Sequence, residues 1–244
     1  MPDQQSPPPK PISELWRPEL TRLPRLHWRR RWFRTFARGL CRLVIALCTR
    51  STVEGLEHYP RRGPALVVIN HLGDTDAPLL VGTLPAAPDA LGKIEMFDYP
   101  ILGRLMDWYG VIWLHRGLPD RRAIRAALQA FEEGRIVLIA PEGRYSLIGG
   151  LEEGHQGAAY LALKAGVDVV PVALIGTENA HVYGHLKRLR RVPIRMKVGK
   201  AFRLVRGGDR QKMLQEGTRQ VMQHLAKLLP AAYQGAYGDP YSHD

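Results

Sequence analysis

The sequence predicts an α/β domain in which a mostly parallel or mixed sheet is flanked by helices. Short apolar runs at residues 66–69, 136–140 and 167–175 have the composition of strands buried on both faces. Segments with helical periodicity separate such runs, and this alternation favours a mostly parallel sheet. The chain has 244 residues, of which 45% are hydrophobic, so it can bury the core of one such domain.

The stretch around which the chain is organised is residues 65–80. An apolar run ends at Asn70 and His71, a polar loop follows, and a second apolar segment begins with Pro78 near its start. Asp76 is a good helix N-cap and proline is tolerated in a first turn, so we predict strand, loop and helix. His71 then stands at the carboxyl end of a strand, where ligands bind in open α/β sheets.

The spacing between His71 and Asp76 requires this turn. On one continuous helix, residues five apart lie about 140° from each other and could not touch. Across a strand–loop–helix turn, the carboxylate can hold one imidazole nitrogen and leave the other to accept a proton. The alternative is a loop histidine satisfied by a cap. His115 and Asp120 repeat the spacing, with His115 in a strand-like run and Asp120 at a predicted helix cap, so spacing alone does not identify a catalytic pair.

The remaining elements follow from apolar periodicity, caps and glycine stops. In chain order we predict a weak strand at 90–96, a helix at 99–109, a strand at 111–115, a helix from Asp120 through Glu133, the strand at 136–140, a small-residue helix at 154–165, the strand at 167–175, a last strand at 194–198 and a helix from Asp209 through Leu229. Pro171 lies inside its strand, which predicts an edge strand or a bulge there.

The two ends of the chain differ from the domain at residues 51–230. Residues 1–25 are proline-rich and polar and predict a disordered arm, and residues 231–244 predict a flexible tail. Residues 26–50 predict a basic amphipathic helix, with aromatic anchors on one side and a strip of arginines at positions 30, 34, 38 and 42. That pattern is typical of a membrane-interface helix. The alternative is a helix packed on its own domain with a solvated basic face.

Charge and cysteine usage narrow the class of protein. The net charge of +12 predicts an anionic partner: nucleic acid, an acidic membrane surface or a phosphorylated substrate. The positive charge is the only feature that supports a nucleic-acid partner, and this is too little evidence. We therefore expect no nucleic-acid partner. Cys41 and Cys48 form no disulfide framework, which fits a reducing compartment. No run approaches the roughly 20 apolar residues of a membrane span. We therefore expect a peripheral or monotopic protein on the cytoplasmic side of a membrane.

Further polar residues follow the predicted strand ends. Arg116 follows one strand and can make a two-pronged phosphate contact, with an ordinary surface arginine as the alternative. Glu142 and Gly143 follow another strand and predict a tight turn with exposed backbone N–H groups. Lys93 is a second candidate phosphate contact. The alternative is an ordinary solvated lysine side chain. If the sheet is parallel, these residues and His71 share one rim.

Four ordered blocks resemble the glycerolipid acyltransferases of the 1-acylglycerol-3-phosphate O-acyltransferase type. They are the Asn70-His71 to Asp76 signature, GVIWLHR at 110–116, PEG at 141–143 and VVPVA at 169–173. The connecting Lys93-Ile94-Glu95, with a following proline and glycine, is also similar. The resemblance covers roughly residues 50–205. It departs from the family in the third block, where Arg144 stands one place early and Tyr145 takes the usual arginine position.

The resemblance implies acyl transfer from acyl-CoA or acyl carrier protein to the sn-2 hydroxyl of 1-acylglycerol-3-phosphate, with a lysophospholipid and acidic phospholipids as partners. His71 would be the general base and Asp76 would orient it. The implied phosphate-binding residues are Lys93, Arg116, Glu142, Gly143 and Arg144, and the supporting residues are Asn70, Ser146 and Pro171. No metal and no bound cofactor are expected. The alternatives are acylation of glycerol-3-phosphate or of another lysolipid or lipid-like acceptor, and a non-catalytic lipid-binding homologue.

Overall fold

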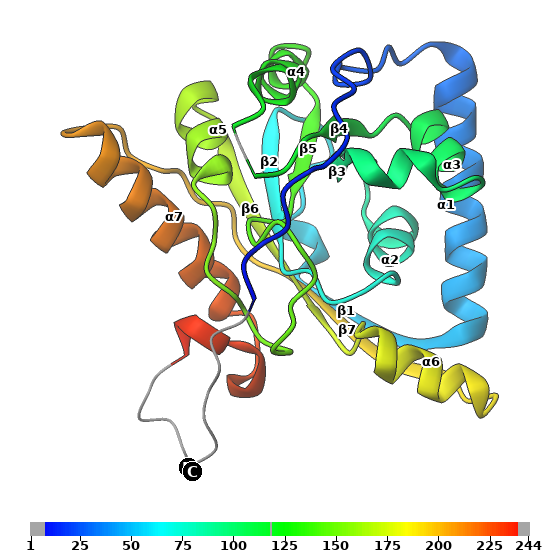
Figure 1. Cartoon of the computed structure of the whole chain (residues 1–244). Coiled ribbons are helices and arrows are strands. Elements are labelled where there is room, and N and C mark those ends of the chain that lie inside the picture. Colours follow the sequence, from blue (N-terminus) through cyan, green and yellow to red (C-terminus); the bar gives the residue numbers. More distant parts are fainter. Residues whose placement is uncertain (1–7, 118, 239–244) are drawn as a thin grey trace.

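A seven-stranded mixed sheet forms the centre of the protein (Figure 1). The structure is a computed structural model that describes residues 8–117 and 119–238. The strand order is β1-β7-β6-β2-β5-β3-β4. Neighbouring strands are parallel except β6 and β7, so the predicted mixed α/β fold is confirmed. The strands are β1 (Thr49–Glu54), β2 (Ala65–Ile69), β3 (Asp89–Lys93), β4 (Ile112–Leu114), β5 (Ile136–Ile139), β6 (Asp168–Ile175) and β7 (Val192–Val198).

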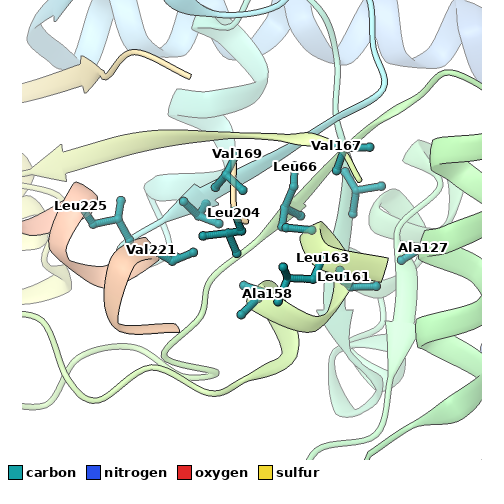
Figure 2. Close-up of a cluster of buried hydrophobic side chains, with 14 of the residues drawn as sticks. Leu66, Ala127, Ala158, Leu161, Leu163, Val167, Val169, Leu204, Val221 and Leu225 are labelled. Carbon is teal, nitrogen blue, oxygen red and sulfur yellow. The ribbon is translucent and has the colours of Figure 1, made fainter. Parts of the chain in front are cut away.

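Helices cover both faces of this sheet (Figure 1). The helices are α1 (Trp28–Cys48), α2 (Asp76–Thr83), α3 (Leu102–Tyr109), α4 (Arg121–Glu132), α5 (Gly157–Ala165), α6 (Asn179–Lys187) and α7 (Arg210–Ala226). Short 3₁₀ helices lie at 56–58, 94–98, 231–233 and 235–237. Alternate residues of β2 divide the core, because successive strand side chains point to opposite faces. Leu66 and Val68 pack with α4, α5 and α7 (Figure 2), and Val67 packs with α1 and α2.

Strand β6 shows how the fold accommodates Pro171. The strand lies between β2 and β7, so the edge-strand alternative is wrong. The bulge alternative holds, because the β6–β7 register shifts by one residue between the Val172–Val198 pair and the Val169–Phe202 bridge. Pro171 sits at that shift and its carbonyl accepts the N–H of Gly199 at 2.8 Å. Proline offers no ladder N–H, which a bulge tolerates.

Helix α1 lies against the domain largely through its arginines, with Phe33 and Ile45 packed on the same side. Arg34 is 8% exposed, donates to the carbonyl of Tyr109 at 2.7 Å and pairs with the buried Asp89. Arg38 and Arg42 donate to carbonyls at the end of α2, and Arg30 donates to carbonyls at the end of α3. These carbonyls lack partners within their own helices and carry the negative end of the helix dipole, so guanidinium groups are favoured there.

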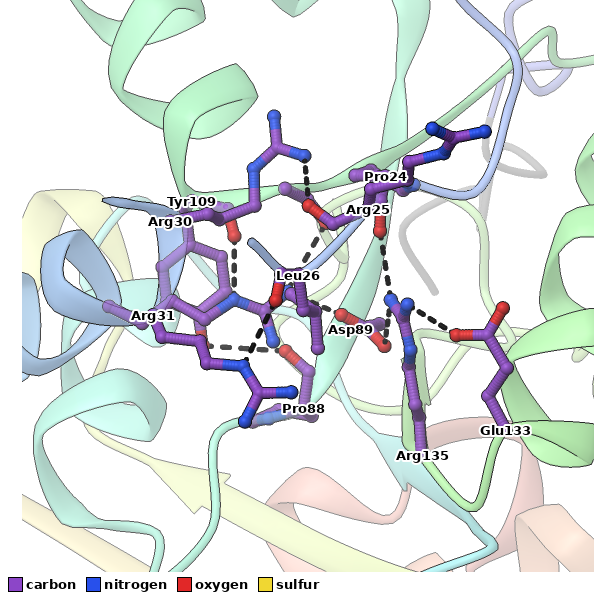
Figure 3. A network of polar contacts seen from close by, with 12 residues as sticks. Pro24, Arg25, Leu26, Arg30, Arg31, Pro88, Asp89, Tyr109, Glu133 and Arg135 are labelled. Carbon is purple, nitrogen blue, oxygen red and sulfur yellow. Dashed lines mark hydrogen bonds and ion pairs between the residues drawn. The ribbon is translucent and has the colours of Figure 1, made fainter. Parts of the chain in front are cut away.

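A network around Asp89 holds this contact (Figure 3). Arg135 approaches the second Asp89 oxygen at 3.5 Å and also donates to the carbonyl of Pro24 and to Glu133. The predicted arginine strip therefore exists, but it is not directed to solvent or to a bilayer. The opposite side of α1 is apolar and exposed, as Trp28, Trp32, Phe36, Leu40, Leu43, Val44 and Leu47.

Most of the segments predicted as a disordered arm and a flexible tail follow defined paths. Residues 8–25 contact the domain at several points, and Thr21 is 6% exposed. Near the other end, Leu151 exchanges backbone hydrogen bonds with Tyr233 and Ala236. Residues 1–7 and 239–244 of those two predictions lie outside the described residues. Across the described part of the chain, no helix combines the length and apolar character that a membrane span needs.

Candidate active site

The parallel strands β2, β5, β3 and β4 bring their carboxyl ends to one rim of the sheet. His71 follows β2, Glu142 follows β5, Lys93 ends β3 and Arg116 follows β4. These residues therefore share the rim that the sequence predicts for them. Because adjacent strands lie about 4.8 Å apart, the backbones of His71 and Arg116 are separated by about 14 Å, three strand spacings.

His71 and Asp76 form a close pair at this rim. Nδ1 of His71 lies 2.6 Å from Oδ2 of Asp76, whose residue is fully buried. The same carboxylate oxygen accepts the backbone N–H groups of Leu72 and Gly73 at 2.8 and 3.1 Å. Asp76 is the first residue of α2, and the N-cap position belongs to Thr75. The prediction of Asp76 as the helix N-cap is therefore wrong, and its carboxylate is directed back to the loop that carries His71.

The two nitrogens of the His71 imidazole differ in their contacts: Nδ1 is hydrogen-bonded to Asp76, and Nε2 has no partner among the described residues. Asp76 is a carboxylate acceptor, so Nδ1 carries the proton and Nε2 keeps its lone pair. The side chain is 28% exposed, and among the described residues no hydrogen bond reaches Nε2. Tyr145 packs edge-on against the ring, with 4.3 Å between centroids. This arrangement can accept a proton from a molecule that binds at the rim.

The backbone around His71 is held by buried polar groups. Asn70 exchanges two hydrogen bonds with the backbone of Leu174 on β6. Glu142 is fully buried and accepts the N–H of His71 at 3.2 Å and of Glu152 at 2.8 Å. Burial raises the pKa of Glu142 to about 7. Both Glu142 oxygens therefore accept backbone N–H groups inside the protein, and Glu142 supports the backbone of His71. Its predicted phosphate contact stays a prediction.

The loop after Glu142 makes several of its polar contacts within the protein. Gly143 has φ 72°, and its N–H donates to the carbonyl of Ala140, so this N–H is not free for a ligand. Arg144 is paired with Glu152 at 2.8 Å in an almost completely buried contact, and it donates to the carbonyl of Pro8. Two nitrogens of the Arg144 guanidinium, Nε and Nη1, are therefore used within the protein. Ser146 supports the loop, since its N–H donates to the carbonyl of His71 at 2.8 Å.

Arg116, a predicted phosphate contact, follows β4 at the same rim. Its side chain is 17% exposed, and Nη2 lies 3.7 Å from Oε1 of Glu95. Lys93 is partly exposed at the end of β3, and its side chain forms no hydrogen bond with the described residues. Pro171 pairs with Val68 within the sheet, below the rim, so it supports the strands and not the site.

Two further residues shape the site and were not predicted to do so. Tyr145 donates to Asp74 at 2.8 Å, and Tyr183 of α6 donates to the other oxygen of the same carboxylate at 2.9 Å. The loop between His71 and Asp76 is therefore tied to α6. Gly73 is required there, because a Cβ would lie 2.5 Å from the carbonyl oxygen of Thr177. The sequence signal for Tyr145 was its place where the family has arginine, but nothing in the pattern indicated α6.

The second His–Asp pair lies at the end of β4. His115 Nδ1 is 2.8 Å from Oδ2 of Asp120, and both side chains are buried, at 6% and 5% exposure. Nε2 of His115 accepts the backbone N–H of Arg17 at 3.0 Å, and the ring of Trp16 covers the imidazole. Asp120 also caps α4, as predicted. Burial alone would raise the pKa of Asp120, but hydrogen bonds from His115 and from the α4 backbone lower it below its ordinary value.

The chain is similar to known acyltransferases. A family model described as Acyltransferase matches residues 50–175. The chain is 38% identical over 136 residues to a lyso-ornithine lipid O-acyltransferase of Pseudomonas aeruginosa, covering 55% of this chain and 51% of the relative. It is 31% identical over 153 residues to a chloroplastic 1-acyl-sn-glycerol-3-phosphate acyltransferase of Arabidopsis thaliana, covering 62% of this chain and 43% of the relative. The chain thus spans about half the length of these relatives.

The fold also has a solved counterpart. The crystal structure of the 1-acyl-sn-glycerophosphate acyltransferase PlsC from Thermotoga maritima superposes with a TM-score of 0.63. The superposition covers 82% of this chain and 80% of the other, at 22% sequence identity. At that identity the likeness establishes a shared fold.

Proposed function

Since the chain belongs to the acyltransferase family, we propose that it transfers a fatty acyl group from a thioester to the hydroxyl of a lysolipid. The proposed first acceptor is 1-acylglycerol-3-phosphate, with its sn-2 hydroxyl as the attacking group, and the donor is acyl-CoA or acyl carrier protein. The observation that carries the proposal is the His71–Asp76 pair, 2.6 Å apart, with Nε2 open at the rim that also holds Arg116.

The chemistry follows from the two nitrogens of His71. Nε2 takes the proton of the acceptor hydroxyl as its oxygen attacks the thioester carbonyl carbon. Asp76 keeps Nδ1 protonated and stabilises the imidazolium that forms. When the tetrahedral intermediate collapses, the C–S bond breaks and the proton on Nε2 passes to the departing thiolate. The new ester and the free thiol are the products, and no acyl-enzyme is needed.

Arg116 supplies the proposed contact to the acceptor head group, and Lys93 on the neighbouring strand adds positive charge. A second acceptor is favoured by a specific observation. Glu95 lies 3.7 Å from Arg116, so the rim offers a carboxylate beside a guanidinium. A head group with both an amine and a carboxylate, such as ornithine, complements that pair. The 38% identity to a lyso-ornithine lipid O-acyltransferase supports the same candidate.

The test is a turnover assay with the full chain in lipid vesicles. Radiolabelled acyl-CoA or acyl carrier protein is supplied with 1-acylglycerol-3-phosphate, lyso-ornithine lipid or glycerol-3-phosphate as acceptor. We expect turnover with a lysolipid and its loss in His71→Ala. Turnover that survives His71→Ala would remove the assigned base. Failure with every acceptor would favour the non-catalytic lipid-binding alternative.

We also propose that the protein works on a membrane surface, through the exposed apolar side of α1. Trp32 and Phe36 are 65% and 53% exposed on that side, and they help line a shallow groove of ≈ 440 Å³ along the helix. Helix α3 continues the surface with exposed Leu105 and Trp108, and Phe33 of α1 meets Trp108 edge-on. A contiguous apolar surface with exposed cations such as Arg29 and Arg31 beside it suits an acidic bilayer.

This surface can be tested without removing α1, whose Ile45 is part of the core. The double substitution Trp32→Ser and Phe36→Ser should lower co-sedimentation with acidic vesicles more than tenfold, because each buried apolar side chain contributes about 1.5–3 kcal/mol. Leu189→Ser is the matched control, since Leu189 is 97% exposed but lies outside α1 and α3. Equal co-sedimentation of wild type and the double variant would refute this mode of attachment.

A further inference from the structure

Residues 8–17, here called the N-terminal segment, cross the rim that holds the candidate site. The segment is the dark blue trace that passes in front of the sheet in Figure 1. At one end, the carbonyl of Pro8 accepts from Arg144 and Lys10 donates to the carbonyl of Glu153, both beyond β5. At the other end, Arg17 pairs with Asp98 at 2.5 Å, beyond β3. The segment therefore spans the loops that follow β5, β3 and β4.

The centre of the segment is fixed on Arg116. The N–H of Ser13 donates to the carbonyl of Arg116 at 3.0 Å, and the N–H of Arg116 donates to the Ser13 hydroxyl at 2.8 Å. Beside this contact, Ile12 lies so close to Gly117 that a Cβ there would be 2.6 Å from its side chain. Both polar groups of the Arg116 backbone are thus satisfied by one residue 103 positions earlier in the chain.

Ser13 also acts on the neighbour of Arg116. Burial works to raise the pKa of Glu95, but the Ser13 hydroxyl, the Glu95 backbone N–H and the charge of Arg116 hold it below its ordinary value. Glu95 therefore stays ionised beside the guanidinium. Within the described residues, Nε of Arg116 and Oε2 of Glu95 are both buried and have no hydrogen-bond partner. Buried polar atoms are normally paired, so this pair is incompletely satisfied within the described residues. The two side chains keep 17% and 26% of their surface exposed, where a bound head group can reach them.

We propose that Ser13 is a positioning residue of the acceptor site, which holds the Arg116 backbone so that the guanidinium and Glu95 face the head group. This inference rests on the proposed lysolipid acyltransferase function. It assigns part of the site to a segment outside residues 50–175, where the family model matches. Ser13 touches no reacting atom in the proposed mechanism, so its effect belongs to acceptor binding and not to the proton transfer at His71.

The experiment compares Ser13→Ala, Ser13→Thr and the control Glu14→Gln, whose residue is exposed and forms no hydrogen bond with the described residues. We expect Ser13→Ala to raise the KM for the lysolipid about tenfold, the change that about 1.4 kcal/mol produces. The kcat and the KM for the thioester should stay within about threefold. Ser13→Thr retains the hydroxyl and should restore the acceptor KM, and Glu14→Gln should match wild type.

A second measurement keeps this inference separate from the proposed function. Amide hydrogen exchange of the peptide that contains residues 112–117 should be faster in Ser13→Ala than in wild type and Glu14→Gln. An unchanged acceptor KM in an active Ser13→Ala enzyme would overturn the proposal. If wild type acylates no lysolipid, the proposed function fails, and the positioning of Arg116 is then decided by exchange alone. Equal exchange in Ser13→Ala and wild type would overturn it.

Discussion

The molecule contains the same pair of residues at the same spacing twice, and the two pairs are in opposite situations. His71–Asp76 and His115–Asp120 each follow a strand of the sheet, and each joins Nδ1 to a carboxylate oxygen at 2.6 and 2.8 Å. The His71 side chain is 28% exposed, whereas the His115 side chain is 6% exposed. The geometry within the pair does not distinguish a catalytic base from a structural contact.

What distinguishes the pairs is the partner of the second nitrogen. Nε2 of His115 is occupied by the N–H of Arg17 and covered by Trp16, so it cannot accept a proton from a ligand. Nε2 of His71 receives no hydrogen bond from the described residues. The backbone partners differ as well, because the N–H of His115 goes to Asp120 and the N–H of His71 goes to the separate carboxylate of Glu142.

The largest expected effect comes from the same substitution at both carboxylates. Asp76→Asn should lower kcat about 10²–10⁴-fold, because a neutral amide holds Nδ1–H more weakly and the imidazolium loses its counter-charge. Asp120→Asn is the matched control and should leave kcat within about twofold, since asparagine remains a good N-cap. Steady-state kinetics with the lysolipid measures both. Equal losses in the two variants would erase the proposed distinction between the pairs.

A smaller effect, on stability, should appear at the covered pair. His115→Ala leaves the N–H of Arg17 and the carboxylate of Asp120 short of a buried partner, which costs about 1–3 kcal/mol of the free energy of unfolding. Urea denaturation measures this loss, and the kcat of the folded variant should equal that of wild type. A kcat that falls as far as in Asp76→Asn would assign His115 to the chemistry instead.

The smallest effect is a difference in pH dependence between the supporting carboxylates. Burial raises the pKa of Glu142 from 4.5 to about 7, so the folded protein keeps a proton that the unfolded chain releases. Its stabilising contribution is present below pH 4.5 and is lost as the pH rises through about 7. The pKa of Asp120 is lowered, so its contribution is instead lost as the pH falls below 3.8.

Urea denaturation at pH 5.5 and 7.5 tests the Glu142 contribution. Wild type should lose more of its free energy of unfolding between these pH values than Glu142→Gln does, by at most about 1.4 kcal/mol per pH unit. The exposed Glu153→Gln serves as the control and should follow wild type. Parallel pH profiles for wild type and Glu142→Gln would show that Glu142 is ionised throughout this range.

The features that could be predicted from the sequence are those that depend on short-range pattern. Continuous apolar runs located β2 and β5, and parallel pairing then brought His71 and Arg116 to one rim. The polar strand β1 was missed because TRSTVE has neither an apolar run nor clear alternation and lies at the edge of the sheet. Periodicity also predicted that the α1 arginines share a side, but it could not predict which side packs.

The features that could not be predicted depend on contacts between distant positions. Arg144 donates to Glu152 within an irregular loop. The sequence between them has no helical or strand periodicity that could have predicted this contact. Ser13 reaches Arg116 across 103 positions from a proline-rich stretch that composition alone predicts to be disordered. The N-cap position of α2 was wrong by one residue, because the carboxylate of Asp76 is more favourably used by two loop N–H groups and His71 than by its own helix.

Helix α2 contacts α1 at one end and carries Asp76 at the other. It is eight residues long, about 12 Å, and its first residue is Asp76. At the other end of α2, Arg42 of α1 donates to the carbonyl of Gly82. Arg38 of α1 donates to the carbonyls of Leu84 and Pro85, which directly follow the helix. One short helix thus links the arginines of α1 to the carboxylate that holds His71. If α1 lies on a bilayer as proposed, its contact with α2 ties the orientation of the imidazole to that surface.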